Sequence, residues 1–325
     1  EPALAGLAVN EMETLRERFT RAYLAACLCA WRVLPASMLL RWFGAAADAG
    51  AEAAILFSSG SEGMPKGVVL THRNVHANIE QITDMLNPQE DDVMIGCLPL
   101  FHAFGLTVTT LLPLVEALPL LTHPDPTDVV ALSRAIYRYR GTILCATSTF
   151  LRFYVRHARV LPIMLESLRL VVSGAERLDP AVREGFAQKF HKTIYEGYGA
   201  TETTPVASVN VPDYLDADTW KEHHGSRHGT VGLPLPGSCF RVVDPDTLEA
   251  LPPDSDGLIL IGGVQVMQGY LDEPERTHAA IAALDGRRWY RTGDKGHLDA
   301  DGFLTIVDRL KDMLIRGGEN VYPRE

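Results

Sequence analysis

The sequence predicts an α/β protein: a largely parallel sheet flanked by helices, followed by a smaller antiparallel β subdomain of distorted-barrel type. Over 53–206, short apolar runs that end in small or polar residues alternate with helical stretches, which is typical of parallel sheets covered by helices. After 206, strand-like runs are separated by turn residues, which indicates antiparallel β structure. The length of 325 residues predicts about two domains.

The first expected element is helical and strongly apolar, and it covers 11–43. Arg32, Pro35 and Arg41 interrupt it, so no apolar run reaches the ~20 residues that a membrane span needs. We therefore expect a helical pair that is either buried or lies on a surface.

Five strand-like runs follow: AAILFSS (53–59), VMIGCLPL (93–100), TILCATS (142–148), LRLVVSG (168–174) and KTIYEGYG (192–199). Helices are expected at 73–86, 127–139 and 180–190. The last of these follows Asp179-Pro180, a favourable helix start. Ligands gather at the carboxyl ends of parallel strands, so the polar segments after these runs form one candidate site.

The second part contains five short strand-like runs: GTVGLPLPG (229–237), CFRVVDP (239–245), GLILIGG (257–263), GYLDEP (269–274) and GFLTIVDR (302–309). Between the two parts lies a polar loop, 213–229, with His223, His224 and His228. Their spacing fits no standard zinc pattern, so we expect a solvated loop.

The net charge and the cysteines restrict which partners and which redox environment we expect for the protein. The net charge of -11 argues against nucleic acid as a partner, because phosphate backbones need Lys/Arg surfaces. The five cysteines form no CxxC pair, which favours reduced thiols in a cytoplasmic protein.

The segment SSGSEGMPKG (58–67) has the parts of a phosphate-binding loop. Its glycines let backbone N–H groups turn inward, its hydroxyls add donors, and Lys66 adds a charge. It is neither a Walker loop, since Pro65 precedes the lysine and Gly67 follows it, nor a GxGxxG fingerprint. A flexible surface turn is the simpler alternative.

Further segments occur with this loop in one order along 57–325: PLFHAFG (99–105), SGAERL (173–178), YEGYGATE (195–202), WYRTGDKG (289–296) and DRLKDMLIRGGENVYPRE (308–325). Together they resemble the adenylate-forming superfamily, the AMP-binding acyl-CoA synthetases and their relatives. Within it, the closest resemblance is to the acyl-[acyl-carrier-protein] synthetase part of the bacterial 2-acylglycerophosphoethanolamine acyltransferase/acyl-[acyl-carrier-protein] synthetase.

The resemblance implies a ligase that uses ATP and Mg²⁺: a fatty acid forms acyl-AMP, and a thiol then forms a thioester with release of AMP. It implies four subdivisions. They are an N-terminal helical segment (1–52), an α/β nucleotide- and acyl-binding subdomain (53–206), a β-barrel-like subdomain (207–308), and the hinge with the start of a C-terminal domain (309–325).

The resemblance also assigns site residues. Glu202 is the Mg²⁺ ligand, and the catalytic set is Lys66, His102, Thr201 and Glu202. The hinge is Lys311. The nucleotide-binding set comprises Ser58, Ser59, Gly60, Ser61, Gly63, Lys66, Gly174, Ala175, Glu176, Tyr198, Gly199, Thr201, Asp294 and Arg309. Tyr198 would face adenine, whereas Asp294 and Arg309 would bind the ribose. A histidine merely packed between Phe101 and Phe104 stays open as the alternative for His102.

The implied partners are a fatty acid and either acyl carrier protein or coenzyme A, with membrane association of the full-length protein left open. PLFHAFG lacks the aspartate that amino-acid-activating relatives use, which favours a fatty acid. Glu62 would repel a triphosphate at close range, so we expect it to point away from the nucleotide. The alternatives are a long-chain fatty acid–CoA ligase and a nucleotide-binding module without catalysis.

The resemblance also implies that the chain is a fragment of the family's large domain. The lysine that contacts the substrate carboxylate in the family lies beyond Glu325. We therefore expect this chain alone to bind nucleotide and to be weakly active or inactive as a catalyst. A cytoplasmic location is implied, with the cytoplasmic face of the inner membrane as the alternative for the full-length protein.

Overall fold

The computed structural model describes residues 20–44, 48–58, 65–215, 218–309, 314–316 and 319–321. The chain divides into two compact units, Glu1–Asp48 and Ala49–Glu325, and each is described by itself. All of the candidate site residues identified from the sequence belong to the second unit.

The first unit contains α2 (Arg21–Val33) and α3 (Ala36–Phe43). Thr20 caps α2, because its side chain accepts a hydrogen bond from Tyr23 N at 3.2 Å. The chain leaves the helix at Leu34 and resumes it after Pro35, so the expected helical pair is present over the described part of 11–43. Among the described helices, none has the length and apolar character needed to cross a membrane.

A seven-stranded sheet forms the centre of the second unit, in the order β11-β8-β7-β6-β5-β3-β4. Its parallel strands are β3 (Met94–Gly96), β4 (Leu120–Thr122), β5 (Ile143–Ala146), β6 (Leu170–Ser173) and β7 (Ile194–Gly199). The antiparallel strands β8 (Val206–Val209) and β11 (Leu233–Pro234) extend it. The parallel sheet expected from the sequence is therefore confirmed, and four of the five predicted runs lie in it.

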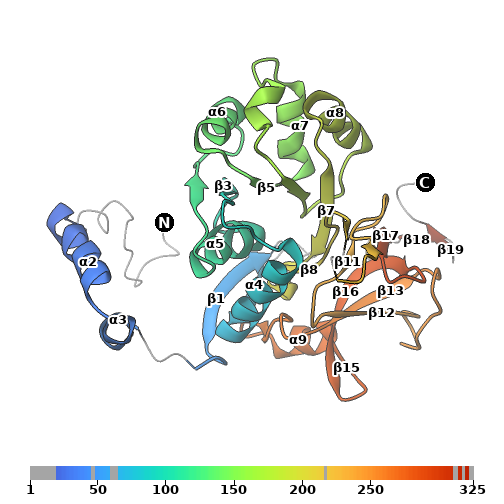
Figure 1. The fold of residues 1–325 in the computed structure, drawn as a ribbon. Coiled ribbons are helices and arrows are strands. Elements are labelled where there is room, and N and C mark those ends of the chain that lie inside the picture. Colours follow the sequence, from blue (N-terminus) through green and yellow to red (C-terminus); the bar gives the residue numbers. More distant parts are fainter. Residues whose placement is uncertain are drawn as a thin grey trace, which may run out of the picture. The chain divides into compact units, whose positions relative to one another are not determined.

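Helices cover both faces of this sheet because its strands alternate apolar side chains between the two faces (Figure 1). On one face, Leu144 and Val171 pack with α6 (Val129–Tyr139), α7 (Ser148–Arg156) and α8 (Pro180–Phe190). On the other face, Cys145 and Val172 share a core with α4 (His72–Leu86), the π-helix η2 (Phe104–Leu111) and α5 (Leu112–Val115).

The helix starts follow from capping residues. Asp179 accepts a hydrogen bond from Ala181 N at 2.9 Å and Pro180 occupies the first turn, so α8 spans the predicted 180–190. Helix α6 begins after Asp128, whose carboxylate accepts from Ala131 N at 3.0 Å. The short 3₁₀ helix η3 (Pro162–Leu165) connects α7 to β6.

The first predicted run is not part of the central sheet, which corrects the sequence-based expectation. It forms β1 (Glu52–Ser58), which pairs antiparallel with β2 (Lys66–Thr71), and β14 (Gly269–Tyr270) completes a separate three-stranded sheet. The run 269–274 was likewise expected among the β-subdomain strands. Its strand joins β2 because the Gln268 N–H and Leu271 N–H donate to the carbonyls of Val69 and Gly67.

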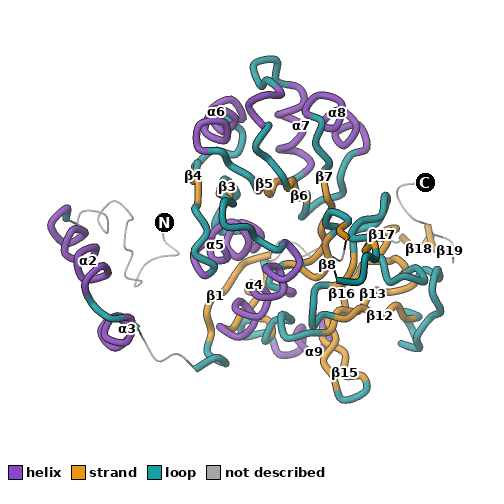
Figure 2. Tube along the Cα trace, viewed as in Figure 1, coloured by secondary structure: helices purple, strands orange, loops and turns teal. Residues whose placement is uncertain are grey.

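The antiparallel subdomain is a five-stranded sheet of β12 (Cys239–Val243), β13 (Gly257–Gly262), β16 (Arg287–Leu298), β15 (Ile281–Leu284) and β17 (Leu304–Arg309). Its strand β16 has 12 residues, and its pairing shifts register against both β13 and β17, which allows the sheet to curl. Helix α9 (Pro274–Ala280) leads into β15. Figure 2 shows this strand-rich part beside the helix-covered sheet.

Three small elements complete the described structure. They are the hairpin of β9 (Tyr214–Leu215) and β10 (Glu222–His223), the 3₁₀ helix η4 (Thr201–Thr203), and the pair β18 (Leu314–Arg316) and β19 (Glu319–Val321). The helix η4 directly follows β7, so it lies at the carboxyl end of a central parallel strand.

Candidate active site

A cavity of about 1000 Å³ opens where the carboxyl ends of β6 and β7 meet the curled antiparallel sheet. Segments that are far apart in the sequence contribute to its wall, from β1 to β17. The residues predicted from the sequence that line it are Ser58, Lys66, His102, Gly174, Ala175, Tyr198, Gly199, Thr201, Glu202, Asp294 and Arg309.

Ser59, Gly60, Ser61, Glu62 and Gly63 lie outside the described residues, as does Lys311. The side-chain direction of Glu62 therefore stays a prediction.

Glu176 belongs to the loop after β6, but its carboxylate is engaged away from the cavity wall. It accepts from Thr149 N at 2.5 Å and from the Thr149 hydroxyl at 3.2 Å, in the first turn of α7. This contact ties the loop to α7.

Asp294 is the centre of a polar cluster in the cavity wall. The residue is 6% exposed, and its carboxylate accepts from Tyr198 Oη at 2.5 Å and from Arg309 Nε at 3.0 Å. Burial and the nearby Asp294 charge raise the pKa of Tyr198 well above its usual value, so the phenol stays protonated and donates. Because a carboxylate has about four lone-pair sites, Asp294 can accept further hydroxyl donors.

Arg309 reaches Asp294 because the strand register places the two residues opposite each other on β17 and β16. Its side chain is largely exposed, whereas the Asp294 carboxylate is buried. The pair therefore presents both an acceptor and a donor at the rim of the cavity.

Glu202 lies in η4, which the turn after Gly199 directs toward the cavity. Its carboxylate is 8% exposed and accepts from Tyr270 Oη at 2.8 Å. The backbone carbonyl of Glu202 accepts from Met267 N at 2.8 Å. Burial and the Glu202 charge raise the pKa of Tyr270, which keeps this phenol a hydrogen-bond donor.

The turn before Glu202 requires glycine at position 199. A Cβ atom built on Gly199 would lie 1.8 Å from the Pro205 carbonyl oxygen, closer than any real contact. The chain from β7 to β8 passes back over itself there, and this close approach brings Thr201 and Glu202 to the cavity wall.

Ser58 and Lys66 mark the two ends of the phosphate-loop segment. They are paired in the β1–β2 ladder, and both line the cavity. The Lys66 ammonium lies 5.3 Å from the centroid of the Tyr270 ring, within cation–π range. A positive charge and a hydroxyl are thus presented where the loop leaves and rejoins the sheet.

His102 lies in the turn before η2. Its Nδ1 accepts from Phe104 N at 3.2 Å, so the neutral ring carries its proton on Nε2. The side chain is exposed at the cavity, yet the surrounding protein atoms lower the His102 pKa by desolvation. Phe104 is buried, whereas Phe101 is exposed, so His102 is not enclosed between two packed rings.

Part of the cavity wall is apolar. It contains side chains from α4, η2 and the central strands: Ile82, Leu86, Val108, Cys145, Val172, Val206 and Val209. Burial raises the pKa of Cys145 to about 12, so this thiol is neutral and behaves as part of the apolar wall.

The π-helix that supplies Val108 was not foreseen from the sequence. It is held by the hydroxyls of Thr109 and Thr110, which both donate to the Gly105 carbonyl, at 3.1 and 2.9 Å. A Cβ atom on Gly105 would lie 2.1 Å from the Pro99 carbonyl oxygen, so this turn also requires glycine. Such π-helical turns are frequent at functional sites.

Glu202 provides the kind of ligand that a magnesium ion requires. The carboxylate is a hard oxygen ligand in the cavity wall, and among the described residues no hydrogen bond reaches its Oε2 atom. The residues present therefore fit a divalent cation that also binds phosphate oxygens.

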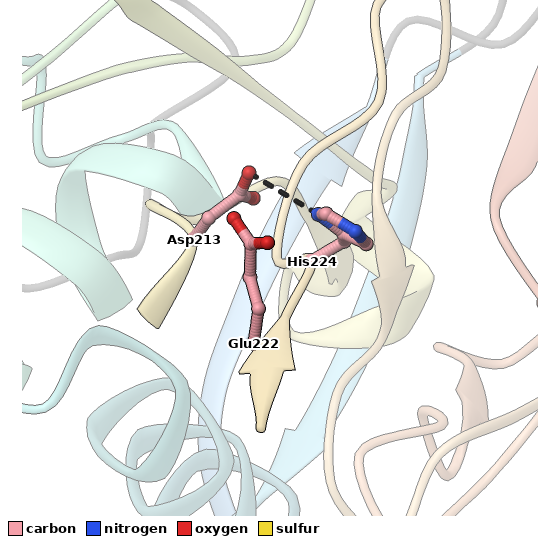
Figure 3. Close-up of side chains that lie close together, drawn as sticks. All are labelled: Asp213, Glu222 and His224. Atoms are coloured by element: carbon pink, nitrogen blue, oxygen red, sulfur yellow. Dashed lines mark hydrogen bonds and ion pairs between the residues drawn. The ribbon is translucent and has the colours of Figure 1, made fainter. Parts of the chain in front are cut away.

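A second group of possible metal ligands lies at the β9–β10 hairpin, outside the cavity (Figure 3). One ligand atom each from Asp213, Glu222 and His224 lies within 4.8 Å of the others, and all three residues are exposed. Of the three loop histidines considered from the sequence, only His224 belongs to this group. His224 Nδ1 lies 3.4 Å from Asp213 Oδ2, and Asp213 also accepts from Gly225 N at 2.9 Å. These bonds hold the loop together without a metal ion.

The sequence reasoning missed several residues of the cavity. Tyr270 lies in the run 269–274, which the sequence predicted only as a strand, and Arg276 follows that run. Tyr290 belongs to WYRTGDKG (289–296), but no role was predicted for it. The hydroxyl of Tyr198 was missed as a donor to Asp294. The only sequence signal for a functional Tyr270 was that GYLDEP (269–274) combines a tyrosine with acidic residues. This signal is weak because such runs also form ordinary strands and turns.

The chain is similar to known proteins in both sequence and structure. The model of a family described as "AMP-binding enzyme" matches residues 36–271. The chain is 33% identical over 273 residues to a long-chain-fatty-acid–CoA ligase of Escherichia coli O6:H1, covering 83% of this chain and 46% of the relative. It is 36% identical over 277 residues to 4-coumarate–CoA ligase 2 of Oryza sativa subsp. japonica, covering 84% and 47%. The chain thus spans about half the length of these curated relatives.

Solved structures show the same architecture. The ATP-bound crystal structure of MatB from Rhodopseudomonas palustris superposes with a TM-score of 0.72 at 31% identity, covering 86% of this chain and 52% of that one. O-succinylbenzoate coenzyme A synthetase (MenE) from Bacillus subtilis, in complex with ATP and magnesium ion, gives 0.71 at 27% identity, covering 85% and 54%.

These comparisons confirm the resemblance to the adenylate-forming superfamily, although they do not single out the acyl-carrier-protein branch. Since the family model covers most of the chain and the curated relatives exceed 30% identity, the chain belongs to the AMP-binding enzyme family.

Proposed function

We propose that the protein activates a fatty acid with ATP, forming an acyl-adenylate and pyrophosphate, and then transfers the acyl group to a thiol. The observation that carries this proposal is a single cavity whose wall combines two kinds of side chain. Lys66, Glu202 and Asp294 supply charged groups, and side chains from α4, η2 and the central strands supply an apolar surface. ATP and a long apolar acid would bind in this one cavity.

The nucleotide would bind near Asp294. Asp294 would accept the ribose hydroxyls while Tyr198 and Arg309 hold its carboxylate in place. Gly174 and Ala175, at the end of β6, would form the wall beside the base. The ATP and ATP–magnesium complexes of the two structural relatives support ATP and Mg²⁺ as the ligands.

The phosphates would bind near Ser58, Lys66 and Thr201. In the first step, the substrate carboxylate attacks the α-phosphate and pyrophosphate leaves. Since a carboxylate is ionised at neutral pH, no general base is required. Lys66 and the hydroxyls of Ser58 and Thr201 would stabilise charge on the phosphoryl oxygens. Glu202 would hold Mg²⁺, which neutralises part of the phosphate charge when bound.

The acid would occupy the apolar part of the cavity. The absence of an aspartate in 99–105 and the apolar wall around Val108 and Val172 disfavour an amino acid with its charged ammonium group. Both named curated relatives are acid–CoA ligases, and one of them acts on long-chain fatty acids. His102 also lines the cavity and would contact the reacting carboxylate or the adenylate.

Two thiol acceptors are candidates. The relatives support coenzyme A. The segments that resemble the acyl-carrier-protein synthetases, including GSEG within 58–67, support acyl carrier protein. We take coenzyme A as the first candidate because it is named for both relatives.

Exchange of labelled pyrophosphate into ATP tests the first step, measured with the protein in its full natural length. We expect exchange that depends on long-chain fatty acids and not on amino acids, and we expect Glu202→Gln to remove most of it. ATP binding without carboxylate-dependent exchange would instead support a nucleotide-binding module without catalysis. Thioester formation, assayed separately with coenzyme A and with acyl carrier protein, would then decide the acceptor.

A further inference from the structure

Tyr270 contacts both Glu202 and Lys66. The proposed function assigns the cation to Glu202 and the phosphates to Lys66. Tyr270 is buried, and its hydroxyl donates to Glu202 Oε1 at 2.8 Å. Its ring lies under the Lys66 ammonium, 5.3 Å from the centroid. A single side chain therefore contacts both Glu202 and Lys66, which are 136 positions apart in the sequence.

The backbone on either side of Tyr270 is hydrogen-bonded to η4 and β2, the elements that carry Glu202 and Lys66. Met267 N donates to the Glu202 carbonyl at 2.8 Å, and Leu271 N donates to the Gly67 carbonyl at 2.7 Å. Tyr270 N donates to Thr277 Oγ1 at 2.8 Å, which ties the strand to α9. The Tyr270 side chain therefore projects from a segment fixed to both η4 and β2, so its position is determined before any ligand binds.

The hydrogen bond to Glu202 has a chemical consequence. It occupies Oε1, and within the described part of the chain no donor reaches Oε2. A carboxylate held at one oxygen keeps the other available to a cation and loses less rotational freedom when the cation binds. The Tyr270 ring likewise restricts the Lys66 side chain through a cation–π contact.

We propose that Tyr270 is a positioning residue that fixes the Glu202 carboxylate and the Lys66 ammonium as one preorganised unit for a magnesium–triphosphate ligand. This inference rests on the function proposed above. It assigns Tyr270 no contact with the reacting atoms, since it acts through Glu202 and Lys66.

The test separates the hydroxyl of Tyr270 from its ring. Tyr270→Phe removes only the donor to Glu202, whereas Tyr270→Leu also removes the aromatic surface under Lys66. Tyr154→Phe is the control: Tyr154 is also buried, lies on α7 and is not part of the cavity lining, and its hydroxyl has no hydrogen-bond partner among the described residues. ATP binding to each variant is measured by calorimetry over a Mg²⁺ titration and in EDTA, so no turnover is needed.

We expect Tyr270→Phe to raise the Mg²⁺ concentration for half-maximal ATP binding by about 10-fold, the usual size of an effect on a metal ligand's supporting residue. ATP affinity in EDTA should stay unchanged in this variant, because the ring under Lys66 remains. Tyr270→Leu should weaken ATP binding in EDTA as well. Tyr154→Phe should match the wild type in both conditions.

A double-mutant cycle separates positioning from a general packing effect. If Tyr270 acts through Glu202, Tyr270→Phe should change nothing further in a Glu202→Gln background. Additive effects, or a wild-type Mg²⁺ dependence in Tyr270→Phe, would overturn the inference while the proposed function stands. A wild-type chain that does not bind ATP would overturn both. Circular dichroism melting checks folding, and if Tyr270→Leu does not fold, Tyr270→Phe and the cycle still decide.

Discussion

At the scale of single residues, the Asp294 carboxylate shows how the site is built. The phenol of Tyr198 on β7 and the guanidinium of Arg309 on β17 both donate hydrogen bonds to it. Asp294 itself is buried. Two donors leave lone pairs on the carboxylate oxygens, and these lone pairs are what a ribose would use. The two donors therefore orient the acceptor without occupying it completely.

We expect Asp294→Asn to weaken ATP binding, because the amide loses the charge and turns one acceptor into a donor. Each lost charge-assisted hydrogen bond costs about 1.5–3 kcal/mol. Calorimetry with ATP measures the loss. The control is Asp285→Asn, since Asp285 is an exposed partner of Arg241 and does not line the cavity. Equal affinity of Asp294→Asn and wild type would remove Asp294 from the nucleotide site.

His102 provides a prediction about pH. Desolvation lowers its pKa below the usual 6.5, so the neutral ring predominates at pH 7. A lowered folded-state pKa means that the unfolded chain binds the proton more readily. The contribution of His102 to stability is therefore present above pH 6.5 and is lost as the pH falls through the folded-state pKa.

An NMR titration of the imidazole signals checks this pKa directly. We expect the His102 signal to titrate below 6.5. A His102 transition at or above 6.5 would contradict the desolvation seen in the structure. His102→Gln should also flatten the dependence of the melting temperature on pH in this range.

At the scale of elements, the start of α4 connects β2, the strand that begins with Lys66, to the segment that carries Tyr270. Thr71, the last residue of β2, caps α4 together with Asn74: Thr71 Oγ1 accepts from Asn74 N, and Asn74 Oδ1 accepts from Thr71 N at 2.9 Å. The Asn74 amide also donates to the carbonyls of Val264 and Val266, at 2.6 and 3.0 Å. One buried amide therefore joins β2, α4 and the chain that leads to β14.

We expect Asn74→Ala to lower the free energy of unfolding by about 2–4 kcal/mol, because it removes half of a cap and leaves the carbonyls of Val264 and Val266 without this donor. Chemical denaturation measures the change. His76→Ala, an exposed position on the same helix, should stay within about 0.5 kcal/mol of wild type. A similarly small effect of Asn74→Ala would show that water replaces these bonds.

At the scale of the whole second unit, the sequence predicted the parallel core well. Local patterns were sufficient where they match the final environment. The apolar runs of β5 and β6 are buried strands, polar segments follow the carboxyl ends of β5, β6 and β7, and α8 begins at a strong capping signal. The pairing of β1 with β2 was not predictable in this way. Residues 53–59 have the composition of a central strand, and only their tertiary partners, β2 and β14, decide that they form a separate sheet.

The candidate site shows the same division. The sequence by itself determined the family, the α/β class and the types of residue needed for phosphate, ribose and cation, because short motifs encode local backbone shape and functional groups. Only the tertiary structure decided that Tyr198 supports Asp294, that Tyr270 contacts both Glu202 and Lys66, and that apolar side chains line the same cavity as these charged groups. These contacts join residues 68 to 204 positions apart, and their geometry depends on strand register and on the close packing at Gly199 and Gly105, which no local pattern specifies.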